Sequence, residues 1–242
     1  MIFRVLTLFP EQFEGFISTS IIGRAIGKNA IQVEIEQIRD FSIDKHKKVD
    51  DAPFGGGAGM VMAVQPLRDA LMSKPRSENS RVIYMSPRGT TLTHEKVVSL
   101  STYDEITIVC GHYEGVDQRF IDRYVDEEIS IGDYVLTGGE LAAMVLMDSV
   151  SRMVDSVLKN DASAEDESFV NGLLEYPHYT RPVEIDGDMV PEVLLSGHHA
   201  EIAKWRLDQS LEITKSRRPD LFEAFTKKVH DKQTIKILKK HL

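Results

Sequence analysis

Residues 81–117 read RVIYMSPRGTTLTHEKVVSLSTYDEITIVCGHYEGVD. Two short runs rich in β-branched and apolar residues, 81–85 and 106–110, predict strands. Residues 93–100 lie between them and suit a helix. Strands that are joined through a helix usually pair in parallel. This stretch therefore predicts an α/β unit with a parallel sheet.

The remainder of the first 160 residues continues the alternation. Residues 3–9 are an apolar run that predicts a strand, and Pro10 opens a helix after it. Residues 31–35 alternate apolar and polar side chains, which indicates a half-buried strand. The sequence predicts an α/β fold with a mostly parallel sheet, in which ligands bind beyond the carboxyl ends of the strands.

Three loops, 84–89, 110–117 and 130–140, each combine glycines with an aromatic and a polar side chain. Each alone could be an ordinary turn. Because the loops that follow parallel strands meet at one edge of the sheet, we expect these three to share a ligand pocket. Their composition suits a flat heterocycle and a ribose held by backbone contacts.

A fourth segment, 54–60, holds four glycines in five positions. Such a run can bring backbone N–H groups close to a ligand or adopt positive φ. It matches neither G-x-G-x-x-G nor the Gly-Lys-Ser/Thr ending of the common nucleotide loops. Composition alone favours a flexible turn here.

The C-terminal part differs in composition. Residues 139–158 predict an apolar helix buried against a sheet or a partner, and the polar run 159–168 predicts a boundary. A further helix starts near residues 196–197. From residue 196 onward, 11 Lys+Arg face 6 Asp+Glu, a net of +5, on a chain of net charge −9. An acidic body with a basic tail is compatible with binding nucleic acid.

Several classes are disfavoured. The longest apolar run, 141–147, is far shorter than the roughly 20 residues of a membrane span, and the first residues lack the order of a secretory signal. The single cysteine, Cys110, fits a reducing compartment, so we expect a cytoplasmic protein without a membrane partner. We find no metal-ligand spacing and no G-x-S-x-G elbow.

Ordered blocks along essentially the whole chain resemble the bacterial tRNA (guanine-N1)-methyltransferase family TrmD, of the SPOUT class. The blocks are 8–10, 44–46 with 49–51, 55–60, 86–89, 111–117, 129–140, 177–182 and 194–199. The resemblance implies S-adenosylmethionine-dependent methylation of N1 of guanosine 37, just 3′ of the anticodon in tRNA. It also implies a homodimer and a deep trefoil knot, which is a rare exception among folds.

The implied domains are a knotted methyltransferase domain (1–160), a flexible linker (161–175) and a small helical C-terminal domain (176–242) that holds the tRNA anticodon stem-loop. The three glycine-bearing loops would bind S-adenosylmethionine. The matching cofactor-binding positions are Tyr84, Met85, Ser86, Pro87, Gly89, Gly111, Tyr113, Glu114, Gly115, Ser130, Ile131, Gly132, Tyr134, Leu136, Gly138 and Gly139.

The chemistry asks for two further groups. N1 of guanine carries a proton that must leave, which calls for a nearby carboxylate, and an arginine near O6 would stabilise the resulting negative charge. Arg152 matches the family's arginine. The family usually has Asp before Ser-Phe, whereas this chain has Glu167 there and Asp166 one place earlier. Alignment favours Glu167 as the base, and Asp166 is the alternative if the loop shifts by one residue.

Four other positions align with family contacts to the target guanosine or its neighbour: His46, Gly59, His112 and Ser163. His112 stands where arginine is frequent in the family, which makes the charge there dependent on pH. Magnesium is a family requirement for which this sequence offers no dedicated protein site. Two rivals stay open: a SPOUT enzyme acting on a ribose 2′-hydroxyl or on ribosomal RNA, and a nonenzymatic RNA-binding module.

Overall fold

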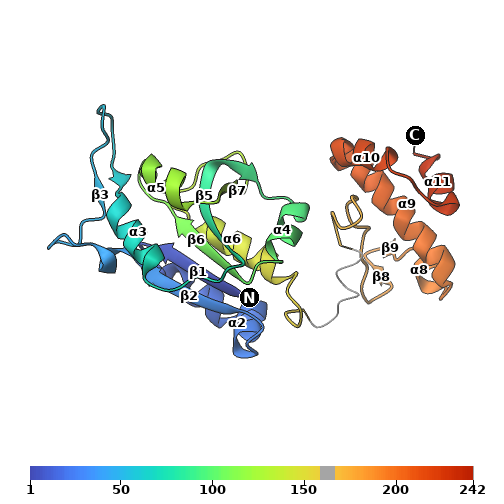
Figure 1. The fold of residues 1–242 in the computed structure, drawn as a ribbon. Helices are drawn as coiled ribbons and strands as arrows, with labels where there is room; N and C mark the ends of the chain where they lie inside the picture. Colours follow the sequence, from blue (N-terminus) through green and yellow to red (C-terminus); the bar gives the residue numbers. More distant parts are fainter. Residues whose placement is uncertain (159–166, 242) are drawn as a thin grey trace. The chain divides into compact units, whose positions relative to one another are not determined.

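The computed structural model describes residues 1–158 and 167–241. The chain divides into two compact units, Met1–Lys159 and Asn160–Leu242, which are described separately (Figure 1). In the described part of the chain, no helix is long and apolar enough to cross a membrane.

The first unit is built on a five-stranded sheet in the order β2-β1-β6-β5-β7. Its strands are β1 (Ile2–Thr7), β2 (Gln32–Gln37), β5 (Ser80–Thr91), β6 (Glu105–Cys110) and β7 (Glu127–Ser130). Every neighbouring pair in it is parallel. The predicted α/β fold with a mostly parallel sheet is confirmed.

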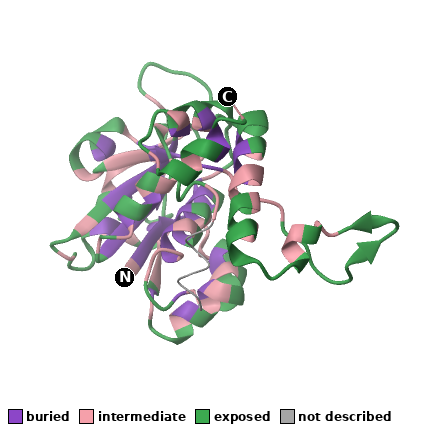
Figure 2. Ribbon diagram, turned by 90° about the vertical axis from the view of Figure 1, so that its right-hand side faces the viewer, coloured by how far each residue is buried: buried purple, intermediate pink, exposed green. Residues whose placement is uncertain are grey.

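Helices cover both faces of this sheet, because alternate side chains of each strand point to opposite faces. Helices α2 (Ser20–Gly27), α4 (His94–Leu100) and α6 (Glu140–Ser151) pack with Phe3, Val5 and Ile108. Helices α3 (Val64–Met72) and α5 (Gln118–Tyr124) pack on the other face with Leu6 and Val109. Strands β1 and β6 are buried along almost their whole length (Figure 2).

Strand β5 meets β7 twice. Met85 and Thr90 both lie opposite Ile129, so the residues between them form an irregularity within β5 where its register with β7 shifts. Gly89 lies where the two strands approach most closely: a Cβ there would be 2.4 Å from the backbone carbon of Glu128. The loop that sequence analysis placed after residue 85 is thus held at both ends by the same neighbouring strand.

Two helix predictions need correction. The apolar helix predicted for 139–158 ends at Ser151, because the following bonds close tighter turns and Ser156 has a positive φ of 69°. Pro10 opens a short 3-10 helix, η1 (Pro10–Phe13), and α1 (Glu14–Ser18) then follows it.

A small antiparallel ladder joins β3 (Asp50–Asp51) to β4 (Val61–Met62), and the glycine run forms the loop between them. Four of its glycines, Gly55, Gly56, Gly57 and Gly59, have positive φ. Figure 1 shows this loop extending away from the sheet. The connection η2 (Ile38–Phe41) leads from β2 towards this ladder.

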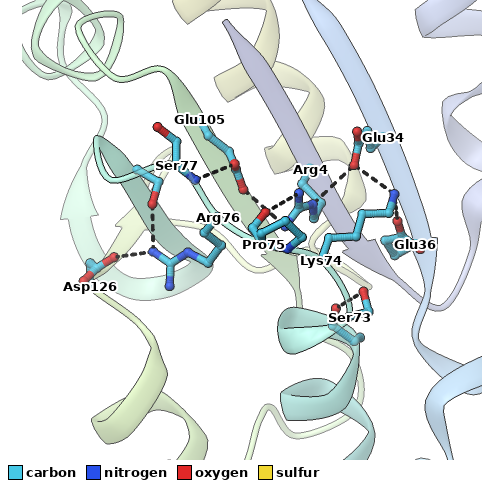
Figure 3. Close-up of polar contacts among 12 residues, drawn as sticks. Arg4, Glu34, Glu36, Ser73, Lys74, Pro75, Arg76, Ser77, Glu105 and Asp126 are labelled. Carbon is cyan, nitrogen blue, oxygen red and sulfur yellow. Dashed lines mark hydrogen bonds and ion pairs between the residues drawn. The ribbon is translucent and has the colours of Figure 1, made fainter.

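The amino end of the sheet is closed by ion pairs (Figure 3). Arg4 Nη1 lies 3.2 Å from Glu105 Oε1, and both side chains are buried. Glu105 Oε2 accepts a hydrogen bond from the backbone N–H of Ser77, and Arg4 Nη2 donates to the carbonyl of Pro75. This network fastens the connection between α3 and β5 to the strands.

The second unit contains helices α8 (Glu192–Leu195), α9 (His199–Arg217), α10 (Pro219–Thr226) and α11 (Lys232–Leu238). A short hairpin of β8 (Glu184–Ile185) and β9 (Asp188–Met189) precedes them. Its core combines Leu173 with Leu211, Phe222, Phe225, Ile237 and Leu238. Leu173 falls within the predicted linker, 161–175, so the end of that segment packs into this unit.

Candidate functional site

A cavity of about 250 Å³ opens at the carboxyl ends of β6 and β7, beside residues 84–87 of β5. This is just below the roughly 300 Å³ at which typical small-molecule sites begin. The three loops expected to share a pocket do line it together. Of the sixteen positions assigned to cofactor binding, the cavity is lined by Tyr84, Met85, Ser86, Pro87, Gly111, Tyr113, Glu114, Gly115, Ser130, Ile131, Gly132, Tyr134, Leu136, Gly138 and Gly139.

Gly89 is the exception, because it lies between β5 and β7 and does not line the cavity. Sequence reasoning also missed lining residues: Ile129, Val135, Thr137 and Ala142. Val135 and Thr137 belong to the same loop as predicted positions, whereas Ile129 lies in β7 and Ala142 in α6. Val135 is 82% exposed, so this loop extends into solvent.

Two glycines let the loops pack directly on one another. A Cβ at Gly139 would lie 2.7 Å from the Cα of Cys110, and one at Gly111 would lie 2.8 Å from the Tyr84 ring. The Gly139 N–H donates to the Gly111 carbonyl at 3.0 Å. Backbone therefore forms much of this wall, which suits a ligand held by main-chain contacts.

Polar groups in the wall have fixed positions. The Ser130 hydroxyl lies within hydrogen-bond distance of both the N–H and the carbonyl of Gly132 and so shapes that turn. Tyr84 is buried, and its burial raises the pKa of its hydroxyl, which keeps the phenol neutral. These groups can recognise a heterocycle and its hydroxyls without adding charge.

Beside the cavity lies a buried carboxylate. Glu140 accepts a hydrogen bond from the Thr7 hydroxyl at 2.6 Å, and both of its oxygens lie 2.8 Å from His112 Nε2. The His112 ring also packs against Phe9, with ring centroids 4.9 Å apart. His112, which sequence analysis assigned to the RNA substrate, thus lines the cavity and contacts Glu140.

Gly59 lies at the edge of this site. A Cβ there would be 2.4 Å from Glu114 Oε1, and the Glu114 N–H donates to the Met60 carbonyl at 3.0 Å. The glycine run is therefore anchored to the cavity wall at its C-terminal end. His46 is exposed, and its N–H donates to Asp44 Oδ1 at 2.7 Å.

The catalytic candidates lie in different units. Arg152 directly follows α6 in the first unit and is partly buried, and Glu167 belongs to the second unit. Asp166 and Ser163 lie outside the described residues. Their assignment to catalysis and RNA binding stays a prediction.

Within residues 1–158 and 167–241, no group of three or more His, Cys, Asp or Glu side chains is arranged to hold a metal ion. Apart from His112 and Glu114, the polar groups of the cavity wall are backbone groups and hydroxyls. This chemistry fits an organic ligand better than a cation.

These features define a class of protein: an α/β domain with a cavity among glycine-bearing loops at the carboxyl edge of a parallel sheet. A family model described as "tRNA (Guanine-1)-methyltransferase TrmD" matches residues 1–224. The chain belongs to this family, which confirms the resemblance seen in the sequence.

Similar curated proteins carry the name tRNA (guanine-N(1)-)-methyltransferase. One from Ruminiclostridium cellulolyticum is 57% identical over 230 residues, covering 94% of this chain and 99% of that protein. Another from Lachnospira eligens is 53% identical over 233 residues, covering 96% and 99%. A third from Alkaliphilus metalliredigens is 52% identical over 241 residues, covering 98% of each.

Proposed function

We propose that this chain is a tRNA (guanine-N1)-methyltransferase that uses S-adenosylmethionine to methylate N1 of guanosine 37, just 3′ of the anticodon. The relatives' shared name supports the reaction class. The observation that carries the proposal is the convergence of loops 84–87, 111–115 and 129–139 on one cavity. These loops contain almost all the positions that the family resemblance assigns to the donor.

The residues present fit S-adenosylmethionine. Glycines at 111 and 139 leave the wall as bare backbone, where a side chain would collide with neighbouring atoms. Tyr84, Pro87 and Leu136 would contact the adenine, and backbone groups of loop 129–139 would hydrogen-bond it. When bound, the donor supplies the methyl group. The protein has to hold it in line with the acceptor nitrogen.

Glu167 is the proposed general base, with Asp166 as the alternative. Its carboxylate would accept the N1 proton as the new N–C bond forms, so that no positive charge builds up on guanine. Arg152 would donate to O6 and stabilise the negative charge that develops there.

A homodimer is part of the proposal. Helix α6 presents Leu141 and Val145 one turn apart, and they are 55% and 47% exposed. A solvent-facing pair of this kind on an otherwise buried helix suits a second copy of the chain. The basic segment from residue 196 onward, with a net of +5, suits the tRNA anticodon stem-loop.

Three finer points complete the proposal. The chain would carry the deep trefoil knot of its class, formed by the three cavity loops. Magnesium, if it takes part, would be held by RNA or by the donor's carboxylate. The single buried cysteine fits a reducing cytoplasm.

The position of the methyl group tests the reaction. The full chain is incubated with methyl-labelled S-adenosylmethionine and a tRNA transcript bearing two guanosines around position 37, and the product is digested for mass spectrometry. We expect label on N1 of guanosine 37. Label on a ribose would favour the rival SPOUT reaction, and absence of transfer would reject the proposal.

The catalytic roles are tested by single-turnover kinetics. Arg152→Ala and Glu167→Ala should each slow methyl transfer about 100-fold or more, as expected for loss of charge stabilisation or of a general base, and should change donor affinity less than threefold. Asp166→Ala identifies which acid acts, and Glu165→Ala is the matched acidic control. Unchanged rates for both Arg152→Ala and Glu167→Ala would reject these two catalytic roles, whereas a nonenzymatic RNA-binding module would show no methyl transfer in the wild type.

A further inference from the structure

Glu140 is a buried charge outside the proposed catalytic groups. It is the first residue of α6 and is only 2% exposed. Burying a carboxylate is costly unless hydrogen bonds and a partner compensate for the lost water. Two described side chains do so: the Thr7 hydroxyl at 2.6 Å and His112 Nε2 at 2.8 Å. The start of a helix also favours a negative charge.

The three side chains come from three elements that meet at the cavity. Thr7 ends β1, His112 lies in the loop after β6, and Glu140 follows the loop after β7. His112 follows Gly111, and Glu140 follows Gly139. The contact therefore bridges the two loops whose glycines form the backbone wall of the cavity.

Gly138, in the cavity wall, packs directly against His112 and Glu140. A Cβ at Gly138 would lie 2.3 Å from His112 Cε1 and 2.6 Å from Glu140 Oε2. The His112 N–H lies 3.2 Å from Met62 Sδ, which fixes the loop from the opposite side. A movement of the His112 ring or of the Glu140 carboxylate would therefore move Gly138 and the turn beside it.

We propose that Glu140 is a positioning residue for the methyl donor: by holding His112, with Thr7 on its other side, it sets the spacing between the Gly111 and Gly138–Gly139 walls of the cavity. This inference rests on the proposed function. In this inference, His112 supports the donor pocket through its contact with Glu140. This role is additional to the RNA contact predicted from the sequence.

The neighbouring thiol is consistent with this arrangement. Burial, together with the negative charge of Glu140, raises the pKa of Cys110 well above its usual range. Cys110 therefore stays a neutral thiol close to the Glu140 charge. The described titratable side chains that face His112 include Glu140, which lies 2.8 Å from its Nε2, and Tyr113, whose ring centroid lies 6.3 Å from the His112 ring; Glu114 belongs to the same cavity wall.

Donor binding to the full chain tests the proposal by isothermal titration calorimetry with S-adenosylmethionine. Glu140→Gln keeps the shape but removes the charge, and we expect the Kd to rise about tenfold. His112→Leu should raise it similarly, and the double variant should raise it no further, because both substitutions break one contact. His112→Arg retains an N–H donor and should restore affinity to within threefold.

Glu105→Gln is the matched control, since Glu105 is 3% exposed and ion-paired at the other end of the same sheet. It should leave the Kd within twofold. With tRNA saturating, Glu140→Gln should raise the donor KM and leave kcat within twofold, a split that a general loss of folding would not give. If Glu140→Gln does not fold, Thr7→Val keeps the Glu140 charge and its contact with His112, removes the hydrogen bonds that the Thr7 hydroxyl donates to Glu140 and accepts from the Phe9 N–H, and should raise the Kd about threefold.

The failures are distinguishable. A wild-type chain that binds no S-adenosylmethionine rejects the proposed function and this inference with it. A wild-type chain that binds, with Glu140→Gln binding equally well, rejects the inference alone. Equal weakening by Glu105→Gln would mean that any buried charge in the sheet affects the pocket, and would also overturn the positioning role.

Discussion

The two ends of the central sheet each bury one glutamate, but with different neighbours. At the amino end, Glu105 meets the permanent charge of Arg4 and the backbone N–H of Ser77. At the carboxyl end, Glu140 meets the His112 ring and the Thr7 hydroxyl. The first carboxylate lies in a polar network with Arg4 and Ser77 (Figure 3), whereas the second adjoins the glycine wall of a cavity.

The difference follows from the direction of the strands. In an open parallel sheet, ligands bind in a crevice outside the carboxyl ends of the strands, whereas ion pairs close the amino end of this sheet. The same residue type therefore stabilises the fold at one end and shapes a binding site at the other. If this contrast is correct, substitutions at the two ends should separate stability from donor affinity.

The largest effect is expected at the amino end. Glu105→Ala leaves Arg4 buried without its main counter-charge, and breaking such a pair costs about 3 kcal/mol. Urea denaturation of the full chain measures the loss in the first unit, and calorimetry with S-adenosylmethionine should give an unchanged Kd. A loss below about 1 kcal/mol, or a weakened Kd, would contradict the contrast between the two ends.

A smaller loss of stability, but a clear loss of binding, is expected at the carboxyl end. Gly139→Ala places a Cβ 2.7 Å from the Cα of Cys110, and the backbone must shift to admit it. We expect about 2 kcal/mol of destabilisation and a tenfold weaker donor affinity. Gly27→Ala is the control, because a Cβ there would meet no described atom within 4 Å. Wild-type affinity in Gly139→Ala would remove the evidence for a backbone wall.

The smallest effect is expected for the solvent-exposed ion pairs around Lys74. Lys74 lies 2.9 Å from Glu34 Oε2, and its hydrogen bond is the main cause of the lowered pKa of Glu34. Lys74→Met should cost about 0.5 kcal/mol at pH 7, as is typical for exposed pairs.

The pH dependence of that difference follows from the direction of the shift. Because the folded pKa of Glu34 is lowered, its contribution is present above the ordinary glutamate range and is lost as pH falls through the lowered pKa. Denaturation of wild type and Lys74→Met should therefore converge in acid. If the denaturation curves of wild type and Lys74→Met still differ below about pH 3, or if the donor affinity changes, the ion pairs around Lys74 are not the only contribution of this side chain.

The sequence predicted the sheet and the location of the cavity well, for reasons visible in single segments. Residues 81–85 and 106–110 are β-branched and apolar, and they form the middle of the sheet as β5 and β6. Glycines at 111 and 139 indicated close backbone approach. Gly89 was likewise predicted to line the cavity, but it lies against the backbone of β7 instead. A glycine in the sequence indicates that something packs closely against it, but not which part of the chain does so.

The helix after Gly139 shows a second limit of the sequence. Apolar residues continue to residue 158, yet the helix ends at Ser151 and leaves Arg152 just beyond it. The spacing of apolar residues predicts which side chains are buried, and Val157 is indeed buried. Buried residues, however, can lie in turns as well as in helices.

The sequence by itself determined the α/β class, the three loops at the sheet edge and the family, because these depend on local residue patterns and their order along the chain. Only the tertiary structure decided that Thr7, His112 and Glu140 form one contact, since residues 133 positions apart in sequence meet through strand pairing and helix packing. The sequence shows which side chains are able to form hydrogen bonds or ion pairs, and the folded backbone determines which of them come close enough to do so.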